Sequence, residues 1–362
     1  MHTIPVRLHG SRDRSYDIVV EAGILRRLPQ SLAAWSDIRG IFLITDATVN
    51  RLYGRQLADA CRKIGLATLV LDVPPGERSK NPELVLELQT ELLRHGVQRS
   101  SLIVALGGGV IGDLAGFVAA TVLRGVSFVQ VPTTLLAQVD SSVGGKVGID
   151  HPAGKNLIGA FHQPRAVYID PLVLKSLPER QFRNGLAEVV KIATALDGQF
   201  FRYLTRHARS LTRTNSKLME TVVVRSAGLK AAVVEKDEYE GSLRKSLNLG
   251  HTIGHAIEAA SNFRISHGEA VSIGMVVEAE IAVRLGLMER ADKTVLERSL
   301  KALKLPTRVP RIGNRRVFFD ALSVDKKSVG GKTKFVLPAG IGCSAIGVDV
   351  PLTLIEAIMD FR

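Results

Sequence analysis

The stretch that decides the fold is Ser101-Leu-Ile-Val-Ala-Leu-Gly-Gly-Gly-Val-Ile-Gly-Asp113. Leu102 to Leu106 form a continuous apolar run, which predicts a strand buried on both faces. Glycines follow with G-x-G-x-x-G spacing, and an apolar helical pattern begins at Val110. Glycine lets a phosphate approach the backbone, and a helix N-terminus offers it free N–H groups. The stretch predicts a nucleotide-phosphate turn, although a tight strand-to-helix turn without a ligand has the same pattern.

Strands and helices alternate around this stretch. Apolar runs predict strands at 4–8, 16–20, 41–45, 68–73, 126–131 and 167–169, the first two forming a hairpin. Helices are expected at 24–32, 48–64 and 82–96. This rhythm implies an open, mostly parallel sheet with helices on both faces. Asp46 follows one predicted strand, at the edge where such sheets bind ligands, whereas no strand ending in an acid lies about twenty residues beyond the glycine turn.

The pattern changes near residue 177. Helical periodicity is found at 179–196, 199–209, 215–234, 250–261, 268–286 and 292–303, and only 334–338 indicates a strand. We therefore expect a Rossmann-like α/β domain over 1–177 and an all-α domain over 178–362. Residues 140–156 contain four glycines and no helical stripe, which is typical of a long functional loop or a disordered linker.

Composition limits the functional class. Of the 362 residues, 46% are hydrophobic and 23% charged, as in an ordinary globular protein. The sequence has no run of about eighteen consecutive apolar residues, so no transmembrane helix is predicted. Residues 1–5 lack the layout of a signal peptide, so a cytoplasmic location is expected. Cys61 and Cys343, without a CxxC motif, argue against a disulfide scaffold and a zinc ribbon.

The net charge of +13 raises the question of nucleic-acid binding. The basic residues are spread along the chain and mixed with acids, and aromatic residues make up only 5%. Few bases could therefore stack on this surface. We expect a basic solvated surface that attracts small anions, with neither nucleic acid nor membrane as a partner.

Histidines and one carboxylate form a candidate metal site. His251 and His255 lie at i and i+4 on one helix face, and His267 precedes the next helix. Thr252 stands where a metalloprotease would have its glutamate. Glu188 lies in an apolar helical stretch, and a buried carboxylate must be paired or bound to a metal. The alternative is a pair of satisfied core histidines with a salt-bridged glutamate, and spacing alone leaves open which histidine would bind the metal.

Cationic and amide side chains gather in the same segments. Singly each is typical of a solvated surface, but together they indicate a small polyanionic substrate. The set comprises Arg124, Lys146, Lys155, Asn156, Lys191, Lys230, Arg244, Asn248 and Lys327.

Several long motifs resemble the 3-dehydroquinate synthase family over nearly the whole chain. They are Gly107-Gly-Gly-Val-Ile-Gly-Asp-Leu-Ala-Gly-Phe117, Val131-Pro-Thr-Thr-Leu-Leu-Ala-Gln-Val-Asp-Ser-Ser-Val-Gly-Gly-Lys146, Gly154-Lys-Asn-Leu-Ile-Gly-Ala-Phe161, Leu247-Asn-Leu-Gly-His-Thr-Ile-Gly-His-Ala-Ile-Glu258, Pro75-Gly-Glu-Arg-Ser-Lys80 and Asp325-Lys-Lys327. The resemblance implies a Rossmann-like NAD-binding domain, a helical metal-binding domain and an active site between them. It also implies a homodimer.

Residue roles follow from the resemblance by position. The implied ligands of Zn²⁺ or Co²⁺ are Glu188, His251 and His267, while His255 becomes a substrate contact and proton-transfer group. The implied NAD site comprises Asp46, Pro75, Gly76, Glu77, Arg78, Ser79, Lys80, Gly108, Gly109, Val110, Ile111, Gly112, Asp113, Thr133, Thr134, Lys146, Lys155, Val173, Leu174, Lys175 and Ser176. The implied substrate site comprises Asp140, Lys146, Asn156, Lys191, Lys230, Arg244, Asn248, His255 and Lys327, with Arg124 from across a dimer interface.

The family reaction converts 3-deoxy-D-arabino-heptulosonate 7-phosphate to 3-dehydroquinate and phosphate in the shikimate pathway of aromatic amino acid biosynthesis. It proceeds by transient oxidation with NAD, phosphate elimination, re-reduction and aldol closure. Val122, Asp150 and Ile192 depart from the family pattern, the last beside Lys191. Another sugar phosphate cyclase and a metal-dependent polyol dehydrogenase are the enzymatic alternatives, and a polyanion-binding module is the non-enzymatic one.

Overall fold

The computed structural model describes residues 1–8, 13–311, 314–324 and 334–359. The chain separates into two units, one of Met1–Leu177 with Met219–Glu235 and one of Pro178–Leu218 with Lys236–Arg362. Residues 219–235 thus belong to the first unit, although they lie in the middle of the second unit's sequence. The sequence predicted instead that residues 178–362 form one contiguous domain. Among the described residues, no helix combines the length and apolar character needed to cross a membrane.

A seven-stranded sheet forms the first unit, in the order β1-β2-β9-β6-β5-β3-β4. Only the hairpin of β1 and β2 pairs antiparallel, and the other pairs are parallel, which confirms the predicted mostly parallel sheet. The strands are β1 (His2–Val6), β2 (Tyr16–Val20), β3 (Gly40–Asp46), β4 (Thr68–Val73), β5 (Ser101–Gly107), β6 (Ser127–Pro132) and β9 (Ala166–Ile169).

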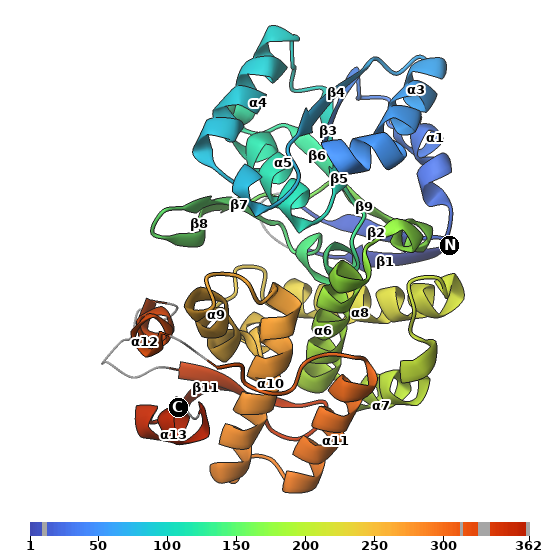
Figure 1. Cartoon of the computed structure of the whole chain (residues 1–362). Helices are drawn as coiled ribbons and strands as arrows, with labels where there is room; N and C mark the ends of the chain where they lie inside the picture. The colour runs from blue at the N-terminus through green and yellow to red at the C-terminus, as the bar shows by residue number, and fades with distance from the viewer. Residues whose placement is uncertain (9–12, 312–313, 325–333, 360–362) are drawn as a thin grey trace. The chain divides into compact units, whose positions relative to one another are not determined.

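Helices cover both faces of this sheet, as Figure 1 shows. Ile103 and Ala105 of β5 pack toward α4 (Pro82–Arg94) and α5 (Gly109–Thr121). Leu102 and Val104 pack toward α1 (Leu28–Ala33) and α3 (Arg55–Lys63), so the apolar run of β5 is buried on both sides. The helical elements are η1 (Ile24–Arg26), α1 (Leu28–Ala33), α2 (Ala47–Val49), η2 (Asn50–Gly54), α3 (Arg55–Lys63), η3 (Glu77–Ser79), α4 (Pro82–Arg94), α5 (Gly109–Thr121), η4 (Val122–Arg124), η5 (Ala137–Ser141), η6 (Pro171–Ser176) and α8 (Ser216–Lys236).

The expected long loop at 140–156 is in fact largely ordered, and that prediction was wrong. β7 (Lys146–His151) and β8 (Gly154–Phe161) pair antiparallel as a separate hairpin. Glycine makes this pairing possible, since a Cβ at Gly148 would lie 2.6 Å from the Ile158 carbonyl oxygen. Gly148, which looked like a loop residue, serves close strand contact instead.

The second unit is helical but not all-α. The strand indicated at 334–338 is β10 (Lys334–Pro338), which pairs with β11 (Ser344–Asp349). The two strands add a hairpin that the all-α expectation left out. The helical elements are α6 (Glu179–Leu196), α7 (Gly198–His207), η7 (Ala208–Ser210), η8 (Leu243–Asn248), α9 (His251–Ala260), α10 (His267–Arg284), α11 (Arg290–Ala302), α12 (Arg315–Val324) and α13 (Leu352–Met359).

Candidate active site

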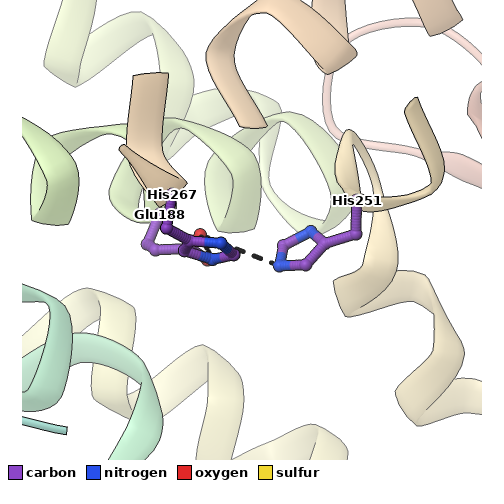
Figure 2. Close-up of side chains that lie close together, drawn as sticks. All are labelled: Glu188, His251 and His267. Carbon is purple, nitrogen blue, oxygen red and sulfur yellow. Dashed lines mark ion pairs between the residues drawn. The ribbon is translucent and has the colours of Figure 1, made fainter. Parts of the chain in front are cut away.

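Three helices of the second unit bring together one carboxylate and two imidazoles. Glu188 lies in α6, and His251 and His267 are the first residues of α9 and α10 (Figure 2). Glu188 Oε1 lies 3.3 Å from His267 Nε2 and 3.8 Å from His251 Nε2. One ligand atom from each residue lies within 4.8 Å of the other two. This donor set suits Zn²⁺ or Co²⁺ and leaves a coordination position for substrate, so a catalytic metal fits the residues.

Local structure explains how His267 is placed beside Glu188. Ser266 caps α10 in a capping box with Glu269, and Ser266 Oγ donates a hydrogen bond to Asn184 Oδ1 at 2.7 Å. A Cβ at Gly268 would lie 2.4 Å from the Asn184 Cα. The first turn of α10 is therefore pressed against α6, one turn before Glu188.

The charges around Glu188 are strongly coupled. Lys191 Nζ lies 2.5 Å from Glu188 Oε2, and both side chains are buried. Burial and the Lys191 charge lower the pKa of His251 to about 3, so this imidazole is neutral. Burial would also lower the pKa of His267, but the Glu188 and Glu258 carboxylates raise it to about 10. His251 is thus neutral and needs no deprotonation to bind a metal. His267 is a positively charged imidazolium in the metal-free protein and must lose one proton to become a ligand.

His255 and Glu258 complete the polar face of α9. The His255 ring centre lies 5.3 Å from that of His251 and 6.0 Å from that of His267. Glu258 is buried, and its Oε2 lies 3.2 Å from His267 Nδ1. Because His267 turns Nε2 toward Glu188 and Nδ1 toward Glu258, the Glu258 carboxylate can orient the ring. Glu258 was not expected from the sequence, although its position seven residues after His251 places both on one helix face.

Arg244 and Asn248 lie together in η8. Arg244 is buried, and its Nη1 donates to the Glu238 carbonyl oxygen at 2.5 Å. Asn248 Nδ2 donates to Glu240 Oε1 at 2.9 Å. Asp237 accepts hydrogen bonds from the backbone N–H groups of the turn before η8, from residues 241, 242 and 244. The turn that leads into η8, and so to both predicted substrate residues, is therefore held by one carboxylate.

The glycine turn of the first unit is shaped for an anion. Gly108 is the N-cap of α5, and no side chain caps the helix. A Cβ at Gly108 would lie 3.0 Å from Thr134 Cγ2, and one at Gly109 would lie 3.1 Å from Ser141 Oγ. Thr133 N donates to the Gly107 carbonyl oxygen at 2.8 Å, which fixes the turn against the end of β6. The first N–H groups of α5 are therefore available to a phosphate.

Lys80 links three residues expected at the cofactor or substrate site. Its Nζ lies 2.7 Å from Asp113 Oδ2 and 3.7 Å from Glu77 Oε1, and it also donates to Asn156 Oδ1. Burial lowers the pKa of Lys80, but the two carboxylates outweigh it and raise the pKa above its usual value. Lys80 is therefore a permanent cation within this unit.

Some of the other residues expected at the cofactor or substrate site contact one another, and others have different partners. Lys230 Nζ donates to the Asp140 carbonyl oxygen at 2.6 Å and also contacts the Asp140 carboxylate. Asp46 caps α2 by accepting from the N–H groups of residues 48 and 49. Ser176 accepts a hydrogen bond from Tyr53. The exposed residues among those expected at the site are Pro75, Gly76, Glu77, Arg78, Arg124, Lys146, Lys155, Asn156, Lys175 and Ser176. Lys327 lies outside the described residues.

Comparison with known proteins assigns the family. Two family models match consecutive parts of the chain: 3-dehydroquinate synthase N-terminal over residues 70–184 and 3-dehydroquinate synthase C-terminal over residues 185–328. The chain belongs to the 3-dehydroquinate synthase family. The resemblance inferred from the motifs is confirmed.

Curated members of the family are similar over nearly the full length. The 3-dehydroquinate synthase of Nostoc punctiforme is 44% identical over 350 residues, covering 96% of each chain. That of Pelotomaculum thermopropionicum is 45% identical over 347 residues, covering 96% of this chain and 93% of the relative.

Solved structures of sugar cyclases share the fold. A 2-deoxy-scyllo-inosose synthase complexed with carbaglucose-6-phosphate, NAD⁺ and Co²⁺ has a TM-score of 0.88 and 28% identity, covering 99% of both chains. The 2-epi-5-epi-valiolone synthase of Streptomyces hygroscopicus, with NAD⁺ and Zn²⁺ bound, has a TM-score of 0.88 and 30% identity, covering 98% of both. A glycerol dehydrogenase of Schizosaccharomyces pombe, 17% identical with a TM-score of 0.64, shares the fold alone.

Proposed function

We propose that this chain converts 3-deoxy-D-arabino-heptulosonate 7-phosphate to 3-dehydroquinate and phosphate, with a divalent metal held by Glu188, His251 and His267 and with NAD held by the first unit. The observation that carries the proposal is the cluster of two imidazoles, His251 and His267, around the buried carboxylate of Glu188. As a member of its family, the chain is an enzyme, a phosphate-eliminating cyclase.

When bound by Glu188, His251 and His267, the metal would supply Lewis acidity towards a substrate hydroxyl. Glu188 and the neutral His251 provide ligand atoms, and Glu258 orients His267. Lys191 keeps an ammonium group beside the carboxylate, where its positive charge attracts an anionic part of the substrate. His255, one helical turn after His251, exchanges protons with the substrate.

NAD supplies reversible hydride acceptance, so that it is returned unchanged after each turnover. The backbone N–H groups after Gly108 bind the phosphates of NAD. The two solved synthases with bound NAD⁺ have the same fold as this chain. Asp46, at the carboxyl end of β3, accepts a hydrogen bond from a ribose hydroxyl of NAD. In other dinucleotide-binding folds an acid about twenty residues beyond the glycine turn makes this contact, and this chain lacks that acid. Lys80, beside Asp113, adds positive charge to the same unit.

The cations and amides outside the metal cluster bind the phosphate and carboxylate groups of the substrate. Lys230 is held by Asp140, and Arg244 and Asn248 are held in η8 by Glu238 and Glu240. Fixed cations of this kind bind phosphate and carboxylate without reorganisation. Asn156 and Lys327 complete the set that the family motifs imply.

We also infer a homodimer in which Arg124 serves the neighbouring subunit. Arg124 is exposed at the end of η4, with a left-handed φ of 61° before Gly125. Mixing two inactive variants, Arg124→Ala and Glu188→Gln, tests this. If Arg124 acts across the dimer, re-association of the mixture restores part of the activity, and no recovery would place Arg124 in its own subunit's site.

The proposed function is tested by phosphate release from the heptulosonate phosphate. Release should require both NAD⁺ and a divalent metal, stop with chelator, and proceed without accumulation of NADH. A steady increase of NADH would indicate a polyol dehydrogenase instead. Steeply salt-dependent binding of nucleic acid, with no requirement for NAD or metal, would indicate a polyanion-binding module.

A further inference from the structure

The first turn of α9 has no capping side chain of its own. Its N-cap is Gly250, which adopts a left-handed φ of 79°. The first N–H groups of a helix lack partners within the helix and must be satisfied from outside when they are buried. His251 is the first residue of this turn, so the position of its imidazole depends on what holds the turn in place.

Glu278 of α10 supplies the missing cap. Its side chain is fully buried, and Oε2 accepts a hydrogen bond from Gly250 N at 2.5 Å. Oε1 accepts a second hydrogen bond from Ile253 N at 3.4 Å. The carboxylate thus spans the first turn of α9 on both sides of His251, and its charge opposes the positive end of the helix dipole.

Close backbone contact lets Glu278 reach α9. A Cβ at Gly274, one turn before Glu278, would lie 2.0 Å from the Gly250 carbonyl oxygen. A Cβ at Gly254 would lie 3.2 Å from the Ala270 carbonyl oxygen. Glycine on both helices therefore brings the two backbones together, and Figure 1 shows α9 beside α10.

We propose that Glu278 is a positioning residue for the metal: it fixes the first turn of α9 and thereby sets His251 relative to Glu188 and His267. Glu278 acts on the cluster through the backbone N–H groups of Gly250 and Ile253, on either side of His251. The same helix α10 carries His267 at its first residue, so Glu278 ties two of the three ligands to one rigid element. This inference rests on the proposed metal site.

Two substitutions separate positioning from bulk stability. Glu278→Gln keeps the shape but turns an amide N–H toward one of the two backbone donors, and Glu278→Asp keeps the charge but shortens the reach. The matched control is Glu280→Gln, which removes a carboxylate two residues along α10 that pairs with Arg284 and Lys293. Each protein is stripped of metal, and its zinc dissociation constant is measured by competition with a chromophoric chelator at a temperature where circular dichroism shows it folded.

Loss of an outer partner of a ligand weakens metal binding by about 10- to 100-fold. We expect Glu278→Gln and Glu278→Asp to raise the zinc dissociation constant by that factor and to change the visible absorption of bound Co²⁺. Glu280→Gln should leave both unchanged.

The outcomes distinguish this inference from the proposed function. Failure of the unsubstituted protein to bind zinc would overturn the proposed function itself. Zinc binding by Glu278→Gln within about twofold of the unsubstituted protein, with the same Co²⁺ spectrum, would overturn only the role of Glu278. If neither Glu278 variant folds while Glu280→Gln does, Glu278 is a general structural residue and the positioning role is rejected.

Discussion

Lys191 Nζ lies 2.5 Å from Glu188 Oε2, and the two residues are one turn apart in α6. Both side chains are buried, so neither charge is well solvated. A buried charge is tolerated when a partner neutralises it, and removal of one partner leaves the other exposed to the full cost of burial. In the metal-free protein, Glu188 is therefore compensated by the ammonium of Lys191 and by the protonated His267, and the proposed metal would supply compensating charge when bound.

Lys191→Met tests this sharing of charge. The variant should lose activity and should lower the thermal midpoint of the metal-free protein, because breaking a buried pair costs about 3–5 kcal/mol. Saturating zinc should recover most of the midpoint, since the ion then neutralises Glu188. Calorimetry with and without zinc measures both effects, with Lys301→Met, which removes an exposed pair with Glu297, as the control. An equal loss of midpoint with and without zinc would contradict the assignment.

His255→Asn should separate proton transfer from metal binding. The variant should retain stoichiometric zinc, because the proposed ligands are Glu188, His251 and His267 and not the second possible donor group of His255, Glu258 and His267. Its kcat should fall by about 10²- to 10⁴-fold, the usual contribution of a general acid or base. Metal analysis and steady-state kinetics give the two readouts, and His95→Asn at an exposed helix end is the control. Loss of zinc would make His255 a ligand.

Gly109→Ala should weaken NAD binding. The new Cβ would lie 3.1 Å from Ser141 Oγ, at the first residue of α5 where the phosphates are proposed to bind. We expect the NAD dissociation constant to rise at least about tenfold, equivalent to about 1.4 kcal/mol. Isothermal titration calorimetry measures it. Gly228→Ala is the matched control, because no atom lies within 4 Å of a Cβ there, and equal NAD affinity in both variants would count against the turn.

Asp237 should make the turn before η8 sensitive to acid. Burial raises the pKa of Asp237, but the N–H groups of Arg244, Ser242 and Gly241 outweigh it and lower the pKa below its usual value of 3.8. Since the folded pKa is depressed, the stabilisation is present above the unfolded pKa and is lost as pH falls through the folded value. Asp237→Asn should therefore be less stable than the unsubstituted protein at pH 7.

Urea unfolding at a series of pH values measures this difference. The gap between the two unfolding midpoints should stay constant above about pH 5 and narrow as the pH falls below the usual value of 3.8. Asp59→Asn, at an exposed ion pair with Arg62, is the control. If the difference between the two midpoints stays constant as the pH falls, the charge of the Asp237 carboxylate does not stabilise the folded protein.

Much of the first unit could be predicted because its signals are local. The apolar run 102–106 gave a strand buried on both faces, and the glycine run after it gave the N-terminus of α5. The β7–β8 hairpin was missed because glycine and lysine are typical of loops, while the feature that permits pairing is the approach of two backbones at Gly148 and Ile158. That approach depends on residues ten positions apart and leaves no periodic pattern.

The metal cluster could be proposed from residue types, but not its supporting contacts. The spacing of His251 and His255 predicted that both lie on one helix face. Which of the two can bind a metal together with Glu188 depends on how α6 packs against α9, which the spacing does not show. Glu258 and Glu278 look like ordinary helical glutamates in the sequence. Their roles come from the packing of α9 against α10, which brings Glu258 to His267 Nδ1 and Glu278 to Gly250 N.

Anomalous scattering at the zinc absorption edge, from crystals grown with Zn²⁺ and NAD⁺, tests the metal assignment most directly. Our assignment predicts one peak bonded to Glu188, His251 and His267 at about 2.0–2.2 Å from each ligand atom. The peak should be absent from crystals of Glu188→Gln grown in the same way. A zinc peak bound to other residues, or no peak near these three while the enzyme still releases phosphate, would contradict the assignment.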